Sequence, residues 1–408
     1  MRQSAYDIII VGGGLVGASL ACALLDSKPN LHLALIDATS EQQEDPRLLA
    51  LHLGSCQLLT NLGLWDQLSA HACPIHQVHV SSQGRFGAVR LSREEIHTAS
   101  LGHVIPAQVI NEVLNERLAK LDNLTLLRPA RLKTLRQEEG KVLLTVSVPP
   151  TPTLPHTAGG GNPRERTIHT PLVIAADGTH STVREQLGIE TEIFDYQQSA
   201  IVTITELKRS HHHIAYERFR DAGTIAMLPL TEQRCATIWS ATNEQVANLM
   251  AMNDSAFLQT LQQHFGYRLG RLLKIQKRHV FPLKQVRVKN PLQQSVLLLG
   301  NAAHTLHPVA AQGLNLALYE VACLAGALRH CEAGLLKLTL EQAQKQLATS
   351  VSLSHHLARF MTKESMLIPH LRQLGMLGLD LTPTLKKHFI RRVTGKAGHV
   401  PRLFLGRG

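Results

Sequence analysis

Aromatic residues are scarce in this 408-residue chain, at 4% of positions, although 44% of its residues are hydrophobic. Few rings leave few platforms on which the bases of a single-stranded nucleic acid could stack. The sequence also lacks a zinc-finger pattern and an RNP-like pattern, so we expect no nucleic-acid partner. The formal charge of +11 and the pI of about 9.5 are then expected to attract other anions, such as phosphates or acidic lipids.

Paired cysteines and an uninterrupted long apolar run are missing as well. The six cysteines are scattered and form no C-x-x-C pair, which predicts buried, reduced thiols. No secretory signal is evident. The apolar stretch Ile8–Leu25 contains four glycines, so a strand followed by a helix explains it better than a membrane span. We therefore expect a cytoplasmic protein.

Histidines are frequent, with 23 in the chain, but their spacing predicts no metal site. His211, His212 and His213 are consecutive, so in a strand or loop they point in alternating directions and cannot all bind one ion. His304 and His307 have helical i,i+3 spacing, but no carboxylate or cysteine lies near them in the sequence. We predict no metal.

The strongest pattern lies near the amino terminus, where an apolar strand, a helix and a second apolar strand are predicted in that order. The first strand, Ile8–Val11, runs into Gly12, Gly14 and Gly17, which have the G-x-G-x-x-G spacing. Asp37 ends the second strand, 37 − 17 = 20 positions after the last glycine. This combination predicts a dinucleotide site.

Each part of this motif has a physical role in holding a dinucleotide. Gly12 permits a tight turn, Gly14 lets a pyrophosphate approach the backbone, and Gly17 lets the helix pack closely on the strand. The helix N-terminus offers unpaired N–H groups to phosphate. Asp37 can accept a hydrogen bond from a ribose 2′-hydroxyl. The alternative is a glycine-rich turn that serves packing only.

One further polar residue follows in a position from which it could reach a dinucleotide. Arg47 comes after the polar segment that follows Asp37, and its guanidinium could contact a phosphate or ribose; the alternative is a solvated loop arginine. Residues 48–53 and 57–62 after it have a helical pattern. Gln108 lies at the start of another helical pattern.

Two later stretches repeat the order of apolar strand, turn and helix. One strand, at 172–176, runs into Asp177-Gly178, which by itself is equally consistent with a cofactor edge and an ordinary turn. The other, at 296–299, leads into a long apolar helix whose start places backbone N–H groups and a positive dipole end at a fixed point. That point suits a ring developing negative charge, and the residues concerned are Gly300, Asn301, Pro308, Gly313, Leu314 and Asn315.

The remaining segments predict a second sheet. Between about 195 and 290, short alternating strands predict a mostly antiparallel sheet that covers a pocket. Residues 149–171 contain six prolines and three consecutive glycines, which predicts a mobile hairpin tip before a return strand at 172–176. Near the C-terminus, an apolar helical stripe precedes a basic tail, typical either of a peripheral membrane contact or of a core-packed helix with a solvated end.

The three motifs, in this order, resemble the aromatic-ring flavin monooxygenases, the group of p-hydroxybenzoate hydroxylase, over about 350 residues. The resemblance implies an α/β fold: a Rossmann-like FAD-binding domain of the glutathione-reductase type, an inserted, mostly antiparallel substrate domain, and a C-terminal helical region. The expected boundaries are 1–72, 99–192 and 276–350 for the FAD-binding domain, 73–98 and 193–275 for the substrate domain, and 351–408 for the basic tail.

The resemblance also implies roles for residues of this chain. FAD would be the cofactor, and NAD(P)H a transient reductant, because no second G-x-G-x-x-G is available to hold a nicotinamide. The residues implied to bind FAD are Gly12, Gly14, Gly17, Asp37, Arg47, Gln108, Asp177, Gly178, Gly300, Asn301, Pro308, Gly313, Leu314 and Asn315. The base that would ionise a phenol cannot be assigned from the sequence.

One departure from the wider family narrows the expectation. That family usually has Gly-Asp where this chain has Gly300-Asn301, and an amide oxygen accepts a ribityl hydrogen bond without the charge. Gly-Asn-Ala-Ala with Thr-Leu-His-Pro resembles the ubiquinone-biosynthesis hydroxylases of 2-polyprenyl-6-methoxyphenol. Further matches to them are Gly54-Ser55-Cys56-Gln57, Ala175 to Ser181, Glu217-Arg218-Phe219 and Ala226 to Pro229.

The expected reaction is therefore hydroxylation of 2-polyprenyl-6-methoxyphenol to 2-polyprenyl-6-methoxy-1,4-benzoquinol. Hydroxylation of another ring position or another phenol is the alternative, and a non-catalytic FAD-binding lipid carrier is a second one. The expected partners are the polyprenyl phenol and an assembly with other ubiquinone-biosynthesis proteins. A peripheral contact with a membrane surface, such as the inner face of the cell membrane, is also expected.

Overall fold

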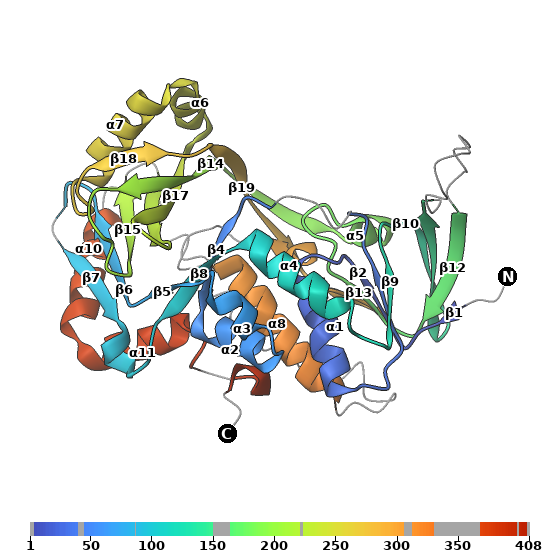
Figure 1. The fold of residues 1–408 in the computed structure, drawn as a ribbon. Coiled ribbons are helices and arrows are strands. Elements are labelled where there is room, and N and C mark those ends of the chain that lie inside the picture. The colour runs from blue at the N-terminus through green and yellow to red at the C-terminus, as the bar shows by residue number, and fades with distance from the viewer. Residues whose placement is uncertain are drawn as a thin grey trace.

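The computed structural model describes two large sheets, two smaller ones and the helices that cover them (Figure 1). The described residues are 4–39, 45–85, 87–149, 164–220, 223–305, 312–329, 368–397 and 400–405. Of the earlier predictions, the tip of the proline-rich hairpin, His307 and Pro308 lie outside them.

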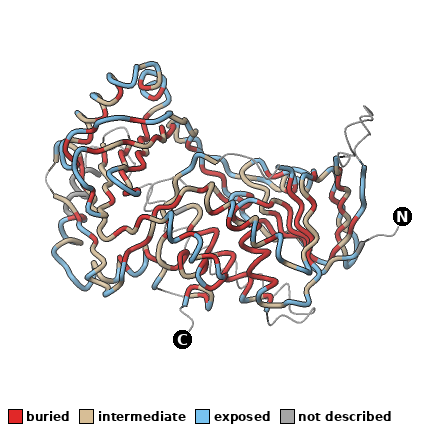
Figure 2. The backbone as a smooth tube through the Cα atoms, viewed as in Figure 1, coloured by how far each residue is buried: buried red, intermediate tan, exposed pale blue. Residues whose placement is uncertain are grey.

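The first large sheet is mainly parallel, with strand order β20-β21-β13-β2-β3-β9. Its four central strands are buried along their whole length, as expected for a sheet covered on both faces (Figure 2). All neighbouring pairs are parallel except β20 with β21. The strands are β2 (Ile8–Val11), β3 (Leu33–Ile36), β9 (Leu124–Leu127), β13 (Val173–Ala175), β20 (Leu292–Gln293) and β21 (Val296–Leu298).

Alternate residues of these strands enter two different cores. Ile8, Ile10, Leu33 and Leu35 pack with helices α1 (Leu15–Ser27), α2 (Leu53–Asn61), α3 (Trp65–Ser69), α4 (Ala107–Leu118) and α8 (Gln312–Arg329). Residues of the opposite face, such as Ile9 and Ile36, pack against a four-stranded sheet and the short helix α5 (Thr182–Gln186). That sheet comprises β1 (Ser4–Ala5), β10 (Arg131–Glu138), β11 (Lys141–Val148) and β12 (Arg164–Thr170).

The second large sheet has nine strands and is antiparallel except where β15 pairs with β6. Helices α6 (Asn243–Ala251) and α7 (Asp254–Phe265) share a core with one face, and α10 (Ile368–Leu381) and α11 (Pro383–Val393) share a core with the other. The strands are β6 (Gln77–Ser82), β7 (Ala88–Ser92), β14 (Thr191–Leu207), β15 (Ile214–Arg220), β16 (Gly223–Pro229), β17 (Arg234–Thr242), β18 (Leu272–Ile275), β19 (His279–Val288) and β22 (His304–Thr305). The predicted fold class is confirmed.

Two local predictions are wrong. The segment expected to begin a helix is strand β4 (Leu48–His52), which pairs with β8 (Gly102–Pro106), itself paired with β5 (Cys73–Ile75). All five β4 residues also line an apolar cavity, so the strand shows no polar–apolar alternation. The return strand of the proline-rich hairpin is β12, which starts at Arg164 and pairs with β11, whereas β13 belongs to the other sheet.

No helix within the described ranges is long and apolar enough to cross a membrane. Five cysteines are described, and all are buried and free: Cys22, Cys56, Cys73, Cys235 and Cys323. The described part of the chain holds no cluster of three or more His, Cys, Asp or Glu residues suited to a metal ion. His211 instead contacts the backbone, with its Nε2 2.7 Å from the carbonyl oxygen of Leu230.

Candidate functional site

The predicted motifs meet at one edge of the parallel sheet, because each follows the carboxyl end of a strand. Gly12 follows β2, Asp37 follows β3, Asp177 lies two residues beyond β13, and Gly300 lies two residues beyond β21. These four strands are consecutive in the sheet, and the carboxyl ends of neighbouring parallel strands lie side by side. Distant parts of the sequence therefore build a single edge.

The three glycines of the first motif differ in what surrounds them. Gly12 has φ +104°, and a Cβ there would lie 2.4 Å from the carbonyl oxygen of Ala176, so the turn requires glycine. A Cβ on Gly17 would lie 1.9 Å from the carbonyl oxygen of Gly12, which explains how closely α1 packs on β2. A Cβ on Gly14 would meet nothing within 4 Å. Gly14 is the N-cap of α1 without a side-chain cap, so its end of the helix faces open space.

A cavity of about 700 Å³ adjoins this edge. The predicted residues that line it are Gly14, Arg47, Gly178, Asn301, Gly313, Leu314 and Asn315. Gly12, Gly17, Asp37, Gln108, Asp177 and Gly300 are not among its lining residues. The cavity thus connects all three motifs, and glycines with open space at their Cβ positions (Gly14, Gly178 and Gly313) contribute one from each.

The opposite walls of the cavity are largely apolar and come from the nine-stranded sheet and α11. They include Val78 and Val80 of β6, Ala226 and Leu228 of β16, and Phe389 of α11. Such a wall suits an apolar ligand with few polar anchors.

Few titratable groups line the cavity. Glu217 is the single carboxylate among its described lining residues. Burial lowers the pKa of His52 to about 4, and its Nδ1 accepts a hydrogen bond from the backbone N–H of Ser55 at 3.1 Å, so this imidazole is neutral at pH 7. Burial raises the pKa of Tyr216, which stays protonated.

Asp37 has a partner that sequence reasoning missed. Its Oδ2 lies 2.7 Å from Nη2 of Arg128, and the two side chains are only 8% and 5% exposed. Arg128 follows β9, the next strand along the same edge, and its Nη2 also donates to the carbonyl oxygen of Gly13 at 3.1 Å. The Oδ1 of Asp37 accepts from the Thr39 hydroxyl at 2.9 Å. Asp37 is thus held rigidly beside the glycine turn. The sequence signal that could have identified Arg128 is its position directly after the apolar strand β9.

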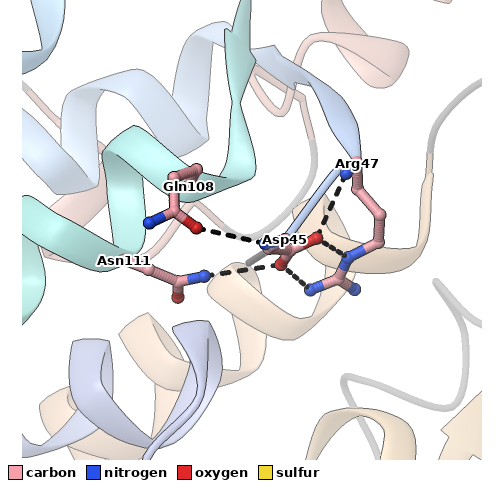
Figure 3. Close-up of polar contacts among 4 residues, drawn as sticks. All are labelled: Asp45, Arg47, Gln108 and Asn111. Carbon is pink, nitrogen blue, oxygen red and sulfur yellow. Dashed lines mark hydrogen bonds and ion pairs between the residues drawn. The ribbon is translucent and has the colours of Figure 1, made fainter. Parts of the chain in front are cut away.

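Arg47 and Gln108 meet through Asp45, another residue not predicted (Figure 3). The Arg47 Nε donates to Asp45 Oδ1 at 2.8 Å, and Gln108 Oε1 accepts from the Asp45 backbone N–H at 3.1 Å. Asn111 contacts the same carboxylate at 3.4 Å. Burial alone would raise the pKa of Asp45, but the hydrogen bonds and charge of Arg47 hold it below its usual value. The ion pair with Asp45 fixes the Arg47 guanidinium at the cavity wall, whereas Gln108 does not line the cavity.

The second motif contains an unsatisfied polar atom. Asp177 Oδ2 accepts from the Val183 backbone N–H at 3.2 Å, near the start of α5. Its Oδ1 is buried and has no hydrogen-bond partner in the described part of the chain. Buried acceptors are rarely left unpaired, so this oxygen is suited to a ligand donor.

The third motif is tied to α8 by Glu320. The backbone N–H of Gly300 donates to Glu320 Oε2 at 2.8 Å, and His304 Nε2 bonds Oε1 of the same carboxylate. Burial alone would lower the pKa of His304, but the Glu320 carboxylate raises it above its ordinary value. His304 therefore does have a carboxylate neighbour, which the sequence, read locally, did not reveal.

Asn315 also has a structural role in α8. Its Nδ2 donates to the Ala50 carbonyl oxygen at 2.8 Å, and its Oδ1 accepts from the His52 backbone N–H at 2.9 Å. These bonds hold β4 against the start of α8, and both elements line the cavity.

These features fit FAD. The glycine turn at the start of α1 leaves open space of the kind that a pyrophosphate needs, and a fixed acid lies near the same turn. Asp177 adds a buried acceptor without a hydrogen-bond partner in the described part of the chain. The family model described as "FAD binding domain" matches residues 5–344.

The chain belongs to the FAD binding domain family. One relative, ubiquinone hydroxylase UbiL of Rhodospirillum rubrum, is 30% identical over 98% of this chain and 92% of its own length. The 3-demethoxyubiquinol 3-hydroxylase of Escherichia coli K12 is 27% identical over 80% of this chain and 81% of its own. In fold, the chain is similar to p-nitrophenol 4-monooxygenase PnpA of Pseudomonas putida, with a TM-score of 0.77 over 97% of this chain and 100% of that one, at 16% identity. The predicted enzyme class, FAD-dependent aromatic monooxygenase, is confirmed.

Proposed function

We propose that this protein is an aromatic hydroxylase of ubiquinone biosynthesis that uses FAD, NAD(P)H and O₂ to convert 2-polyprenyl-6-methoxyphenol to 2-polyprenyl-6-methoxy-1,4-benzoquinol. The observation that carries the proposal is one cavity with two kinds of wall: three glycine-containing turns on one side and an apolar sheet on the other. Relatives named as ubiquinone hydroxylases support the pathway.

The chain's own residues would divide the work of holding FAD. Gly14 and the start of α1 would hold the pyrophosphate, Asp37 the adenosine ribose, and Arg47 a phosphate oxygen. Asp177 would accept a hydrogen bond through its free Oδ1. The start of α8, with Gly313 and Leu314, would lie against the flavin ring. When bound, FAD supplies the reduction of O₂ and the transfer of one oxygen atom to the phenol ring.

The apolar wall would orient the phenol and keep water from the reaction. We assign Glu217 as the group that accepts the phenol proton, because it is the cavity's single carboxylate among described residues and His52 already uses its Nδ1 to accept a backbone hydrogen bond. A phenolate is the more reactive ring toward oxygen transfer, so removing that proton assists the reaction.

Purified protein tests the proposal in two steps. A bound-flavin absorption spectrum reports FAD, and oxidation of NADH or NADPH that depends on a short-chain prenylphenol, with hydroxylated product detected by mass spectrometry, reports catalysis. Protein that binds FAD but makes no product would support the lipid-carrier alternative.

A strain lacking the protein tests the ring position. Accumulation of 2-polyprenyl-6-methoxyphenol is expected. Accumulation of a different ring intermediate would overturn the substrate assignment and leave hydroxylation of another position, the activity in the name of the Escherichia coli relative, as the better description.

A further inference from the structure

Helices α10 and α11 carry an unusual set of exposed side chains. Leu377, Leu381 and Leu385 are 37%, 72% and 53% exposed. Leu377 and Leu381 are one helical turn apart on α10, and Leu385 lies in the first turn of α11, so we name the three the leucine ridge. Large apolar side chains that cluster on a surface mark a contact with another apolar phase.

Positive charge is concentrated in the same segment of the sequence as the leucine ridge. Between residues 368 and 397 the sequence has six Lys or Arg and a single acid, Asp380. Asp380 and Glu95 both pair with Lys386, at 3.0 Å each. The remaining cations of α11 and its C-terminal end form no ion pair with any described residue: Lys387, Arg391, Arg392 and Lys396.

The inner face of the same two helices is part of the cavity. Phe389, Ile390 and Val393 of α11 line the cavity, and Met376 of α10 is buried in the cluster that holds the apolar wall. In Figure 1, α10 and α11 lie beside β6 and β7, at the end of the molecule away from the parallel sheet. One pair of helices thus separates the substrate cavity from the leucine ridge.

We propose that the leucine ridge and its cations dock on an anionic lipid bilayer and that the apolar tail of the substrate passes from the bilayer into the cavity beside α11. This inference rests on the proposed prenylated substrate. A cavity of about 700 Å³ has the size for one drug-sized ligand, so it cannot enclose both FAD and a polyprenyl tail. The rest of the tail therefore lies outside, where a bilayer can receive it.

The charges around the leucine ridge favour an anionic bilayer over other partners. Leucines inserted into the acyl boundary with Lys and Arg at the headgroup level match an anionic surface, and the two nearby acids, Asp380 and Glu95, are already paired with Lys386. A protein partner or a second copy of the chain would bury the leucines equally well but would have to neutralise four cations, and these two occupants are separate outcomes of the test.

The experiment uses the full-length holoprotein in vesicle sedimentation. Phosphatidylcholine vesicles with phosphatidylglycerol should retain the protein, and vesicles of phosphatidylcholine alone should retain much less. The variant L381E/L385E should lose binding. R391E/R392E should reduce partitioning by more than about 30-fold, because the loss of two cations alone gives that factor and two anions are added.

Matched controls lie on and next to strand β18, which pairs with β14. L273E replaces a leucine that is 55% exposed, and R271E/K274E makes the same change in net charge, so both should bind as the wild type does. Flavin absorbance reports that each variant is folded. This assay needs no turnover, so a failure of the substrate assignment leaves it unaffected.

Three results would overturn the proposal: equal binding to both vesicle types, ridge variants that bind like the controls, or a dimer in light scattering that L381E/L385E converts to a monomer. The supporting result has a second readout. Hydroxylation of a long-chain phenol in vesicles should fall in the ridge variants, whereas hydroxylation of a water-dispersed short-chain phenol should not change.

Discussion

The two walls of the cavity are built in opposite ways. The cofactor edge uses strands of three or four residues, and its function lies in the turns that follow them. The substrate wall uses long strands, such as the 17-residue β14, and its function lies in apolar side chains spread along them. Turn chemistry is encoded within a few consecutive residues, whereas the apolar wall exists only after distant strands have paired. Single substitutions in the first wall should therefore destabilise the fold, whereas single substitutions in the second should change the reaction rate with little effect on stability.

The largest effect is expected at the edge, for Arg128→Met. This change leaves Asp37 as a buried charge without its cation and should cost about 3–5 kcal/mol of unfolding free energy. Urea denaturation measures it. Arg117 forms an ion pair with Asp26 at the same distance, 2.7 Å, but with side chains 35% and 31% exposed, so Arg117→Met should cost less than about 1 kcal/mol. Equal losses would mean that burial does not distinguish the two pairs.

The next effect separates two glycines of one turn. Gly12→Ala should destabilise the protein by about 2–4 kcal/mol, because the Cβ meets backbone at a positive φ. Gly14→Ala should leave the free energy of unfolding of the apoprotein within about 0.5 kcal/mol, since its Cβ enters open space, and should instead weaken FAD binding. Thermal unfolding and flavin titration measure the two. Unchanged FAD affinity in Gly14→Ala would remove the pyrophosphate from this turn.

The substrate wall should respond through rate and not through stability. Glu217→Gln should lower the hydroxylation rate about 100-fold at pH 7 with the flavin spectrum unchanged. The rate of the variant should recover as the pH approaches about 10, where a phenol ionises unaided. The control is Glu192→Gln on β14, more than half exposed and paired with Lys289 outside the cavity. A pH profile that Glu217→Gln does not alter would contradict its role as proton acceptor.

The smallest effect concerns the Gly300 turn. The pKa of folded His304 is raised, so the stability from the His304–Glu320 pair is fully present below the unfolded pKa of about 6.5 and is lost as the pH rises through the folded value. His304→Gln should therefore cost on the order of 1 kcal/mol near pH 6 and less at alkaline pH. Denaturation at several pH values checks this, and a cost independent of pH would show that the pair is not charged.

Features encoded in a few consecutive residues could be predicted from the sequence, whereas contacts between distant segments could not. The three turns were predictable because glycine at a positive φ and an acid after an apolar strand leave a local signature. Three site residues were not assigned, because each acts through a contact between segments that are distant in the sequence. Glu320 of α8 binds the Gly300 turn, Arg128 binds Asp37 across the sheet edge, and Asp45 joins the loop after β3 to α4.

Secondary structure was misjudged where the surroundings were unusual. Alternate residues of strand β4 pack against two different hydrophobic clusters, so both faces are apolar and the sequence shows no polar–apolar alternation. Helix α6 was not predicted, although Thr242 and Gln245 have the capping-box spacing, and the Thr242 hydroxyl does accept from the Gln245 backbone N–H at 3.3 Å.

The first and last long strands of the nine-stranded sheet pair with each other, and Thr191 lies opposite Val288. If residues 191–288 were replaced with the corresponding segment of a relative, both junctions with the host would lie at this one residue pair of the sheet. The donor would have to match two further registers, Ile214 opposite Gln77 and Val286 opposite Thr305. If the proposed function holds, chimeras cut there would exchange the range of phenols accepted while the turns proposed to bind flavin stayed those of the host.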